Sequence, residues 1–271
     1  MQTSQLTVEQ VRGRSAVTAS RAHSPLQLLN PQNHGHAAWV YQSSLGGGFV
    51  RGDDVSLEVS VGEGSALFLS SQSSSKAYKR TKSTSTLSAT VRGAGVLVLW
   101  PEPVTCFAAA GLTQRQHVSL DRSASLLFVD AFTAGRVARG ERWAFAHLES
   151  RLEVERAGEL WLREAVRLNP AQGPLEPRMQ GLEAFATVVV CGPAFSHLSA
   201  HLNQTIAARP VREHVQVTCS PRDDGVVLRL AAARVDAMLL ELQGLLREGV
   251  SAFLGDAPLT PFGRNSSRMS V

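Results

Sequence analysis

Apolar and polar residues alternate along much of the first two thirds of the chain. Segment 55–61 places valine or leucine at every second position, with serine or glutamate between them. This period is typical of a strand that buries one face and exposes the other. Glycine-containing turns such as 62–64 and 93–95 separate segments of this kind. Residues 13–168 are therefore predicted to form a strand-rich body, as a sandwich, a barrel or a coil of short strands.

Residues 187–255 have a different pattern. A short apolar strand is predicted at 187–191, a helix around 198–206 and a strand pair at 215–217 and 226–228. Apolar residues at helical spacing predict a longer amphipathic helix at 234–254. We expect one domain over 1–271, in which this α/β layer packs on the strand-rich body and 262–271 form a frayed tail. No repeat of fixed length is visible, which argues against a regular solenoid.

Composition narrows the class of protein. The chain has 271 residues, and 27 Lys plus Arg against 23 Asp plus Glu give a net charge of +4, too small an excess to require nucleic acid. Cys106, Cys191 and Cys219 form no CxxC pair, which disfavours a disulfide framework or a zinc knuckle. The sequence shows neither an apolar run long enough to span a membrane nor an apolar core for a secretion signal. A cytoplasmic protein is the simplest expectation.

The glycine-rich stretch 46–53 is the most unusual local feature. It reads GGGFVRGD, lacks the lysine that ends a phosphate-binding loop, and precedes a strand instead of a helix. Glycine here indicates a tight turn or a close approach of two backbones. Asp53, which ends the stretch, either caps that turn or faces a polar channel.

A second unusual stretch spans residues 70–90, which are rich in Ser and Thr and include Lys76, Lys79, Arg80 and Lys82. The simplest interpretation is a solvated hairpin. A surface for single-stranded nucleic acid would need aromatic residues for base stacking, and only Tyr78 is present. A docking loop for an acidic protein surface stays open.

Two further groups of residues could carry chemistry. Asp130 follows an apolar strand, and a buried carboxylate needs a partner, for which Arg136, Arg139 and Arg142 are the candidates. The group is either a structural ion-pair network or part of a polar conduit through an apolar body.

His197 and His201 stand four residues apart on the predicted helix, so both could face one metal ion. No third ligand can be named for them. A surface or core pair of histidines is therefore the favoured interpretation.

Five motifs occur in a recognisable order. They are SPLQLLNP at 24–31, GGGFVRGD at 46–53, SQSSSKAY at 71–78, PEPVTCF at 101–107, and the pairs Gly-Arg at 135–136 and Gly-Glu at 140–141. The series resembles the UreD family of urease accessory proteins, also called UreH. The likeness extends from residue 20 to residue 260.

This resemblance implies a maturation factor that is not an enzyme. Members of the family assemble with a helical adaptor, UreF, and a nickel-carrying GTPase, UreG, and dock on apo-urease to help deliver Ni²⁺. The implied fold is a distorted, helix-like coil of strands with a few α-helices. A water-filled passage through the protein is proposed in the family to carry the nickel. No cofactor is expected to stay bound, and Ni²⁺ would be in transit.

The resemblance also assigns residues. Asp53 matches the acid that closes the glycine-rich motif and is the first candidate for the passage wall, followed by Asp130 and Glu141. Ni²⁺ accepts nitrogen and oxygen donors, and weak contacts pass an ion along where a tight site would trap it. Arginines beside Glu141 would oppose a cation unless they pair with acids or point outward. The remaining motif positions are Gly46, Gly47, Gly48, Gly52, Gln72, Lys76, Tyr78, Gly135, Arg136 and Gly140.

Two other functions are considered. A β-coil carbohydrate-active enzyme would need two carboxylates that converge in one groove. A basic nucleic-acid-binding module would show steep salt dependence, and the sparse aromatics and small net charge argue against it.

Overall fold

A computed structural model describes residues 2–33, 35–50, 52–209 and 215–254. Strands hold 51% of these residues and helices 19%, which confirms the prediction of a mainly β fold. The strands are β1 (Ser4–Val11), β2 (Arg14–Arg21), β3 (Leu26–Leu29), β4 (Ala38–Ser44), β5 (Gly48–Phe49), β6 (Asp54–Val61), β7 (Ala66–Ser71), β8 (Lys76–Ala77), β9 (Lys82–Val91), β10 (Val96–Leu99), β11 (Val104–Cys106), β12 (Gly111–Leu120), β13 (Ser125–Thr133), β14 (His147–Arg156), β15 (Glu159–Leu168), β16 (Ala184–Cys191), β17 (Val215–Arg222) and β18 (Gly225–Ala232). The helices are η1 (Val137–Arg139), η2 (Pro170–Gln172), α1 (Leu175–Met179), η3 (Pro193–Phe195), α2 (Ser196–Ala207) and α3 (Val235–Leu254).

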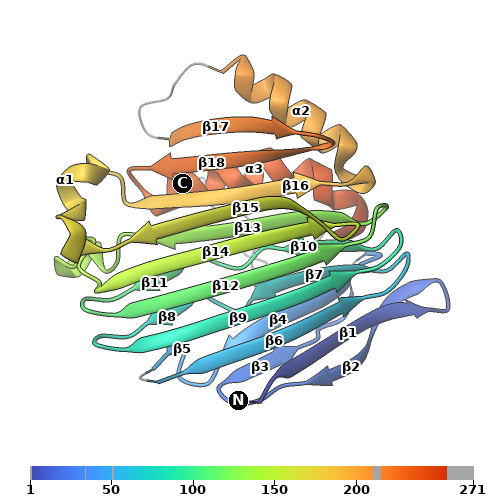
Figure 1. The fold of residues 1–271 in the computed structure, drawn as a ribbon, viewed down its shortest axis with the longest axis horizontal. Helices are drawn as coiled ribbons and strands as arrows, with labels where there is room; N and C mark the ends of the chain where they lie inside the picture. The colour runs from blue at the N-terminus through green and yellow to red at the C-terminus, as the bar shows by residue number, and fades with distance from the viewer. Residues whose placement is uncertain (1, 34, 51, 210–214, 255–271) are drawn as a thin grey trace, which may run out of the picture.

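The strands wind into a β-solenoid of about three turns (Figure 1). The first sheet has the order β15-β14-β12-β9-β6-β1-β2, and the second sheet follows β17-β18-β16-β13-β10-β7-β4-β3. The chain alternates between the sheets, so strands of successive turns lie parallel without the helical crossovers of an α/β fold. This confirms the expected coil of strands, although the strands begin at Ser4 and not near residue 13.

The inference against a solenoid, drawn from the lack of a sequence repeat, is wrong. Successive turns share the pattern of inward-facing positions and not the residue identities, so the sequence shows no repeat. The register of β6, β9, β12 and β14 aligns Val59, Ala89, Val118 and Val154 in one row across the first sheet. These four side chains are buried in the core between the two sheets. Several different apolar residues can fill such a row, because burial of each large one contributes about 1.5–3 kcal/mol whatever its exact shape.

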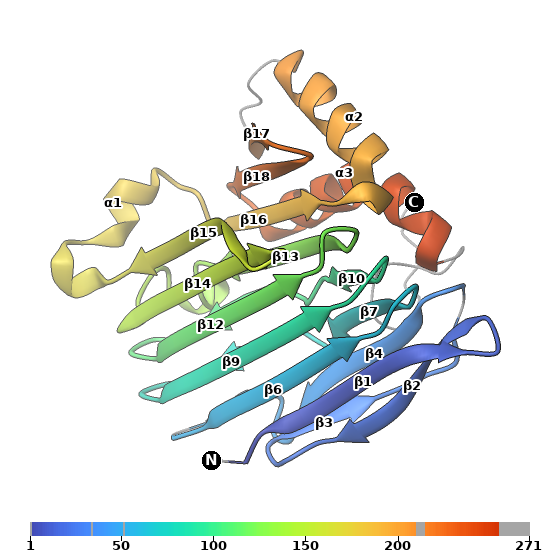
Figure 2. The ribbon, with the colours of Figure 1, turned by 45° about the vertical axis from the view of Figure 1, so that its right-hand side comes forward.

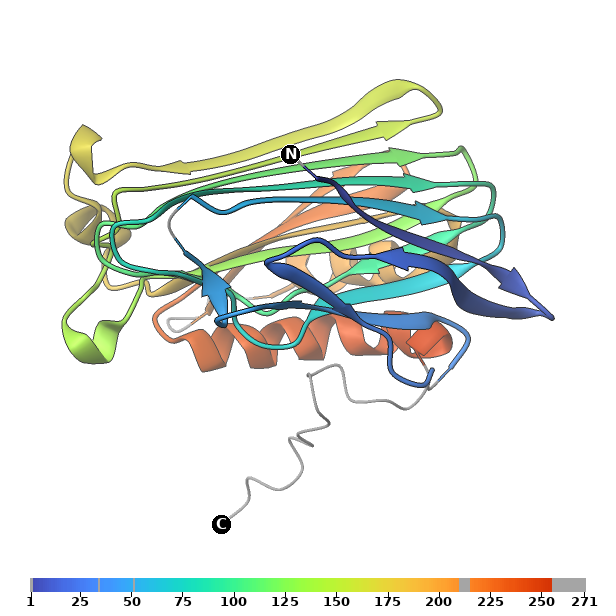
Figure 3. The same cartoon turned by 90° about the horizontal axis from the view of Figure 1, so that it is seen from below.

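Helices α2 and α3 cover the outer face of the second sheet, as the views in Figures 2 and 3 show. Helix α3 buries Met238, Leu242, Leu246, Val250 and Leu254, the stripe that the sequence predicted. Helix α2 and the strand pair β17–β18 also confirm the predicted elements of the second half. None of the helices in the described part of the chain has the length and apolar character needed to cross a membrane. The predicted tail at 262–271 lies outside the described residues.

The second sheet is interrupted at one level along its strands. The path from β4 to β5 is broken at residues 45–47, that from β7 to β8 at 72–75, and that from β10 to β11 at 100–103. Beyond these breaks β5, β8 and β11 pair with one another and then with the unbroken β13. The breaks divide the solenoid into a long part and a short end, which we call the motif end because four of the five motifs lie there or border it.

Candidate functional site: a polar layer between two apolar cores

The glycine-rich motif allows two backbone segments to lie in close contact at the motif end. Gly48 pairs with Lys76 on β8, and a Cβ atom at Gly48 would lie 2.1 Å from the Lys76 carbonyl oxygen. Lys76 in turn pairs with Thr105 on β11. The Tyr78 hydroxyl donates to the Gly46 carbonyl oxygen at 2.8 Å, which ties the glycine turn to the lysine-tyrosine motif. These motif positions therefore hold three strands together.

Glu141 is held in an ion-pair network with Arg136 and Lys79. Arg136 donates from Nε and Nη2 to the two carboxylate oxygens at 2.9 and 2.5 Å, and Lys79 Nζ lies 2.6 Å from Oε1. The hydrogen bond from Arg136 is the main cause that lowers the pKa of Glu141 to about 2. The Arg136 guanidinium also lies 4.2 Å from the Phe107 ring centroid. Two cations already neutralise this carboxylate, and the resulting ion pairs hold the motif end together.

Gly135 and Gly140 shape the loop that presents this network. Gly135 has a φ of 112°, and a Cβ there would lie 2.6 Å from the Glu141 carbonyl oxygen. Gly140 ends η1 in the left-handed conformation, at a φ of 72°. Left-handed backbone also occurs at the turn glycines Gly47 and Gly52.

A layer of polar side chains crosses the interior of the solenoid, between the sheets. On the second sheet the inward row continues from Gln42 to Ser71 and, across the break, from Asp130 to Thr187. On the first sheet the facing row contains Ser85, Gln114 and Ser150, which are neighbours on β9, β12 and β14. We call these seven residues the polar layer. One apolar cluster fills the long part of the solenoid and another fills the motif end, so the layer lies between two apolar cores.

Asp130 is the buried carboxylate of the polar layer, with 8% of its surface exposed. Ser150 Oγ donates to Asp130 Oδ2 at 2.6 Å, across the space between the two sheets. Burial raises the pKa of Asp130 to about 7, although the bond from Ser150 lowers it. The prediction that Asp130 pairs with an arginine is wrong, because the loop that follows β13 turns the three arginines away from this interior.

The three arginines instead pair with acids or are exposed. Arg136 binds Glu141, and Arg142 Nη2 lies 2.5 Å from Glu183 Oε1. Arg139 is exposed. None of these three lines the cavity beside Asp130, although another arginine, the exposed Arg115 on β12, does.

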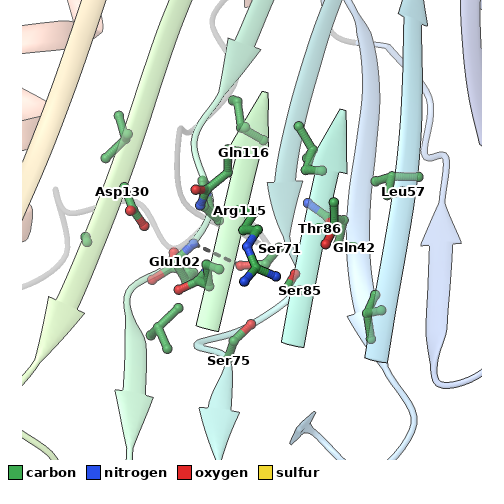
Figure 4. Close-up of a pocket in the computed structure, with 18 of the residues that line it drawn as sticks. Gln42, Leu57, Ser71, Ser75, Ser85, Thr86, Glu102, Arg115, Gln116 and Asp130 are labelled. Atoms are coloured by element: carbon green, nitrogen blue, oxygen red, sulfur yellow. Dashed lines mark hydrogen bonds between the residues drawn. The ribbon is translucent and has the colours of Figure 1, made fainter. Parts of the chain in front are cut away.

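Asp130 and Glu102 line one cavity of about 90 Å³, shown in Figure 4. The Ser71 hydroxyl accepts a bond from the Glu102 backbone N–H at 2.9 Å, and burial raises the pKa of the Glu102 carboxyl. Gln114 Oε1 is buried there without a hydrogen-bond partner among the described residues. A polar cavity of this size has room for a few water molecules.

A second cavity of about 180 Å³ adjoins the first at the interrupted level of the second sheet. Gln42, Ser75 and Ser85 line both cavities. Gln72 lies in the wall of the second cavity, where its side-chain oxygen accepts a bond from Ser43 Oγ at 2.5 Å. The described lining of this second cavity is uncharged, with serine hydroxyls, glutamine amides and a few apolar groups. The second polar cavity thus lies at the breaks in the second sheet.

An ion pair ends the layer on the opposite side. Arg229 on β18 is the neighbour of Thr187, and it donates to both oxygens of Glu164 on β15, at 3.2 and 2.6 Å. Neighbouring strands are about 4.8 Å apart, so Arg229 begins only two strand spacings from Asp130. The layer therefore runs across the solenoid from the Glu164–Arg229 pair to Gln42.

The other sequence candidates do not meet at this cavity. The Asp53 carboxylate accepts a bond from the Val50 backbone N–H at 2.7 Å and caps the turn before β6. His197 and His201 are both exposed on α2. No group of three His, Cys, Asp or Glu side chains suited to a metal ion occurs within the part of the chain that the structure describes.

Sequence reasoning missed Glu102, Gln114, Ser85 and Ser150. Ser150 is a single polar residue between apolar inward positions of β14, whereas Ser85 and Gln114 each have a polar neighbour on the same inward face. Glu102 lies in the break between β10 and β11. Aligning the strands turns these separate polar positions into one layer.

Comparison with known proteins agrees with the family that the motifs indicated. The family model described as UreD urease accessory protein matches residues 2–265. The chain belongs to the UreD family. It is 44% identical over 241 residues to the urease accessory protein UreD of Anaeromyxobacter sp. (strain Fw109-5), covering 87% of this chain and 81% of that protein. The UreD of Sorangium cellulosum (strain So ce56) is 41% identical over 265 residues, covering 96% and 83%.

The relatives extend to plants. The urease accessory protein D of Arabidopsis thaliana is 29% identical over 294 residues, which cover 95% of this chain and 99% of that protein. Membership in the UreD family places this chain in urease maturation, as an accessory protein. The polar layer is therefore the interior of a UreD-family solenoid.

Proposed function

We propose that this UreD-family protein docks on apo-urease together with a UreF-type adaptor and a UreG-type GTPase, and that Ni²⁺ crosses its polar layer on the way to urease. The observation that carries the proposal is the Asp130 carboxyl, buried in a polar cavity that lies in a layer crossing the solenoid. Nickel is cargo in this proposal and not a resident cofactor. The cytoplasmic location stays a prediction, and neither a membrane nor a nucleic acid is part of the proposed assembly.

The chemistry of the layer suits transit. Its described lining offers carboxylate, amide and hydroxyl oxygens, which Ni²⁺ accepts as ligands. Asp130 and Glu102 supply negative charge, and the exposed Arg115 also contributes to the lining of the first cavity, whereas the lining of the second cavity is uncharged. Contacts of this kind hold a hydrated cation loosely, and an ion must bind weakly enough to leave if it is to move on.

The three acidic candidates receive different roles. We assign Asp130 to the passage wall, because it alone of the three lines the cavities described above. Asp53 holds the turn before β6, and Glu141 holds the motif end through Arg136 and Lys79. Glu102 joins Asp130 as a second carboxyl on the route.

The test is nickel transfer in a reconstituted system of purified apo-urease, adaptor, GTPase and this protein. Asp130→Asn should lower the nickel content and activity of the urease several-fold while the complex still forms, as judged by gel filtration. Asp54→Asn, an exposed carboxyl on β6, is the matched control and should transfer nickel normally. Unchanged nickel transfer by Asp130→Asn would remove Asp130 from the route.

The enzyme alternative is less well supported. Glu102 and Asp130 do line one cavity, and a glycoside hydrolase requires two carboxyls in one groove. Their cavity of about 90 Å³ is much smaller than the ~300–1,000 Å³ of typical small-molecule sites, and it lies between two sheets. A sugar chain does not fit there.

A further inference from the structure

The motif end carries basic side chains that lack acidic partners. Arg80, Lys82 and Arg139 are exposed, and within the described residues none of them lies within ion-pair distance of an acid. Arg80 lies on the turn between β8 and β9, Lys82 is the first residue of β9, and Arg139 lies on η1. The sequence contributes to this imbalance, because no Asp or Glu occurs from Gly64 to Pro101. We call Arg80, Lys82 and Arg139 the basic surface.

The basic surface is held in place by the ion-pair network beneath it. Lys79, next to Arg80, lies 2.6 Å from Glu141, which is two residues beyond Arg139. This bond joins the β8–β9 turn to the η1 loop, and Arg136 fixes Glu141 from the other side. Neither segment can move away without breaking the network. The three free charges are therefore presented from one preorganised unit, which lowers the entropy lost when a partner binds.

The chemistry of this surface favours a protein partner over a nucleic acid. Single-stranded nucleic acids are bound by stacking bases on aromatic rings between basic side chains. Tyr78, the one tyrosine near this surface, is engaged, because its hydroxyl binds Gly46 and its ring contacts Phe107 edge-on at 5.4 Å. What remains is a cluster of long, charged side chains without a stacking platform.

We propose that the basic surface of Arg80, Lys82 and Arg139 docks an acidic surface on one protein of the urease maturation machinery. The identity of that partner rests on the proposed function, whereas the charge complementarity does not.

The test compares two triple charge reversals. Arg80→Glu, Lys82→Glu and Arg139→Glu are combined in one variant, and the control combines Arg12→Glu, Arg14→Glu and Arg21→Glu on the β1–β2 hairpin. The control residues are also exposed, the change in net charge is the same, and Arg12 shares the left-handed backbone of Arg80, with φ of 51° and 58°. Circular dichroism establishes that both variants are folded.

Binding to purified adaptor, GTPase and apo-urease is then measured at low and high salt. We expect the basic-surface variant to lose at least tenfold in affinity for one of the three proteins at low salt, with a flatter salt dependence, and the control to bind normally. Equal binding of all three proteins by both variants overturns the proposal, as does an equal loss by the control. Loss of RNA binding with protein binding intact also overturns it. Nickel transfer by Asp130→Asn is independent of this outcome, so the two proposals fail separately.

Discussion

Replacing Asp130 with asparagine should stabilise the fold at neutral and alkaline pH. The folded protein holds the pKa of Asp130 at about 7, against 3.8 for the free side chain, because burial disfavours the ionised form. A carboxyl whose pKa is raised on folding retains its proton after the unfolded chain has lost it. The contribution of Asp130 to the free energy of unfolding therefore falls as the pH rises from about 4 to about 7, and it is constant above that range.

The magnitude follows from the two pKa values. Raising the pKa of one carboxyl from 3.8 to about 7 corresponds to about 4 kcal/mol of lost stability above neutral pH. Asparagine carries no charge and can still accept the hydrogen bond from Ser150, which is 2.6 Å from the carboxylate oxygen. Because the cavity admits water and softens the burial, we expect Asp130→Asn to gain about 2–4 kcal/mol at pH 8 and little at pH 4.

Urea unfolding of both proteins across this pH range measures the effect. The difference in free energy of unfolding should open between pH 4 and pH 7, whereas Asp54→Asn should track the wild type throughout. A constant difference across the range would refute the reasoning, since it would show that Asp130 has the same pKa in the folded and unfolded chain. The stabilised variant should also be the one that transfers nickel poorly.

Four other substitutions test the contacts around the site. Gly48→Ala should lower the free energy of unfolding by about 3 kcal/mol or more, because its Cβ would lie 2.1 Å from a backbone oxygen. Gly46→Ala has open space around it and should lower it by about 1 kcal/mol, because of the left-handed backbone at that position. Thermal unfolding of the two variants measures the difference. Glu141→Gln should remove the stability that the wild type loses as the pH falls from about 4.5 to about 2, so its melting temperature should vary less over that window. Ser150→Ala removes a bond that lowers the pKa of Asp130, so the NMR titration of that carboxyl should move to higher pH.

Local pattern was enough to predict most elements of this fold. Alternation at 55–61 gave the inward face of β6, and helical spacing gave α2 and α3, because those signals depend on neighbours within a few residues. Register could not be obtained in this way. Gln114 and Ser150 are neighbours across two strands although 36 positions separate them in the chain, and nothing local records that pairing.

The sequence therefore predicted only part of the candidate site. The burial of Asp130 followed from the apolar strand around it, but its partner is Ser150 on the other sheet and not a nearby arginine. Asp53 and Glu141 were selected from motifs that prove to hold backbone turns and strand contacts in place. Close packing can require a particular residue, as at Gly48, as strongly as chemistry does.

The direction of the polar layer has a consequence for how such a molecule can be resized. The layer runs at right angles to the strands, so every coil of the chain contributes one segment of its wall. Adding or deleting a whole coil would change the length of the polar layer in steps of about 4.8 Å, the spacing between strands. The length of the layer could thus be set by the number of coils, independently of which polar residues line it.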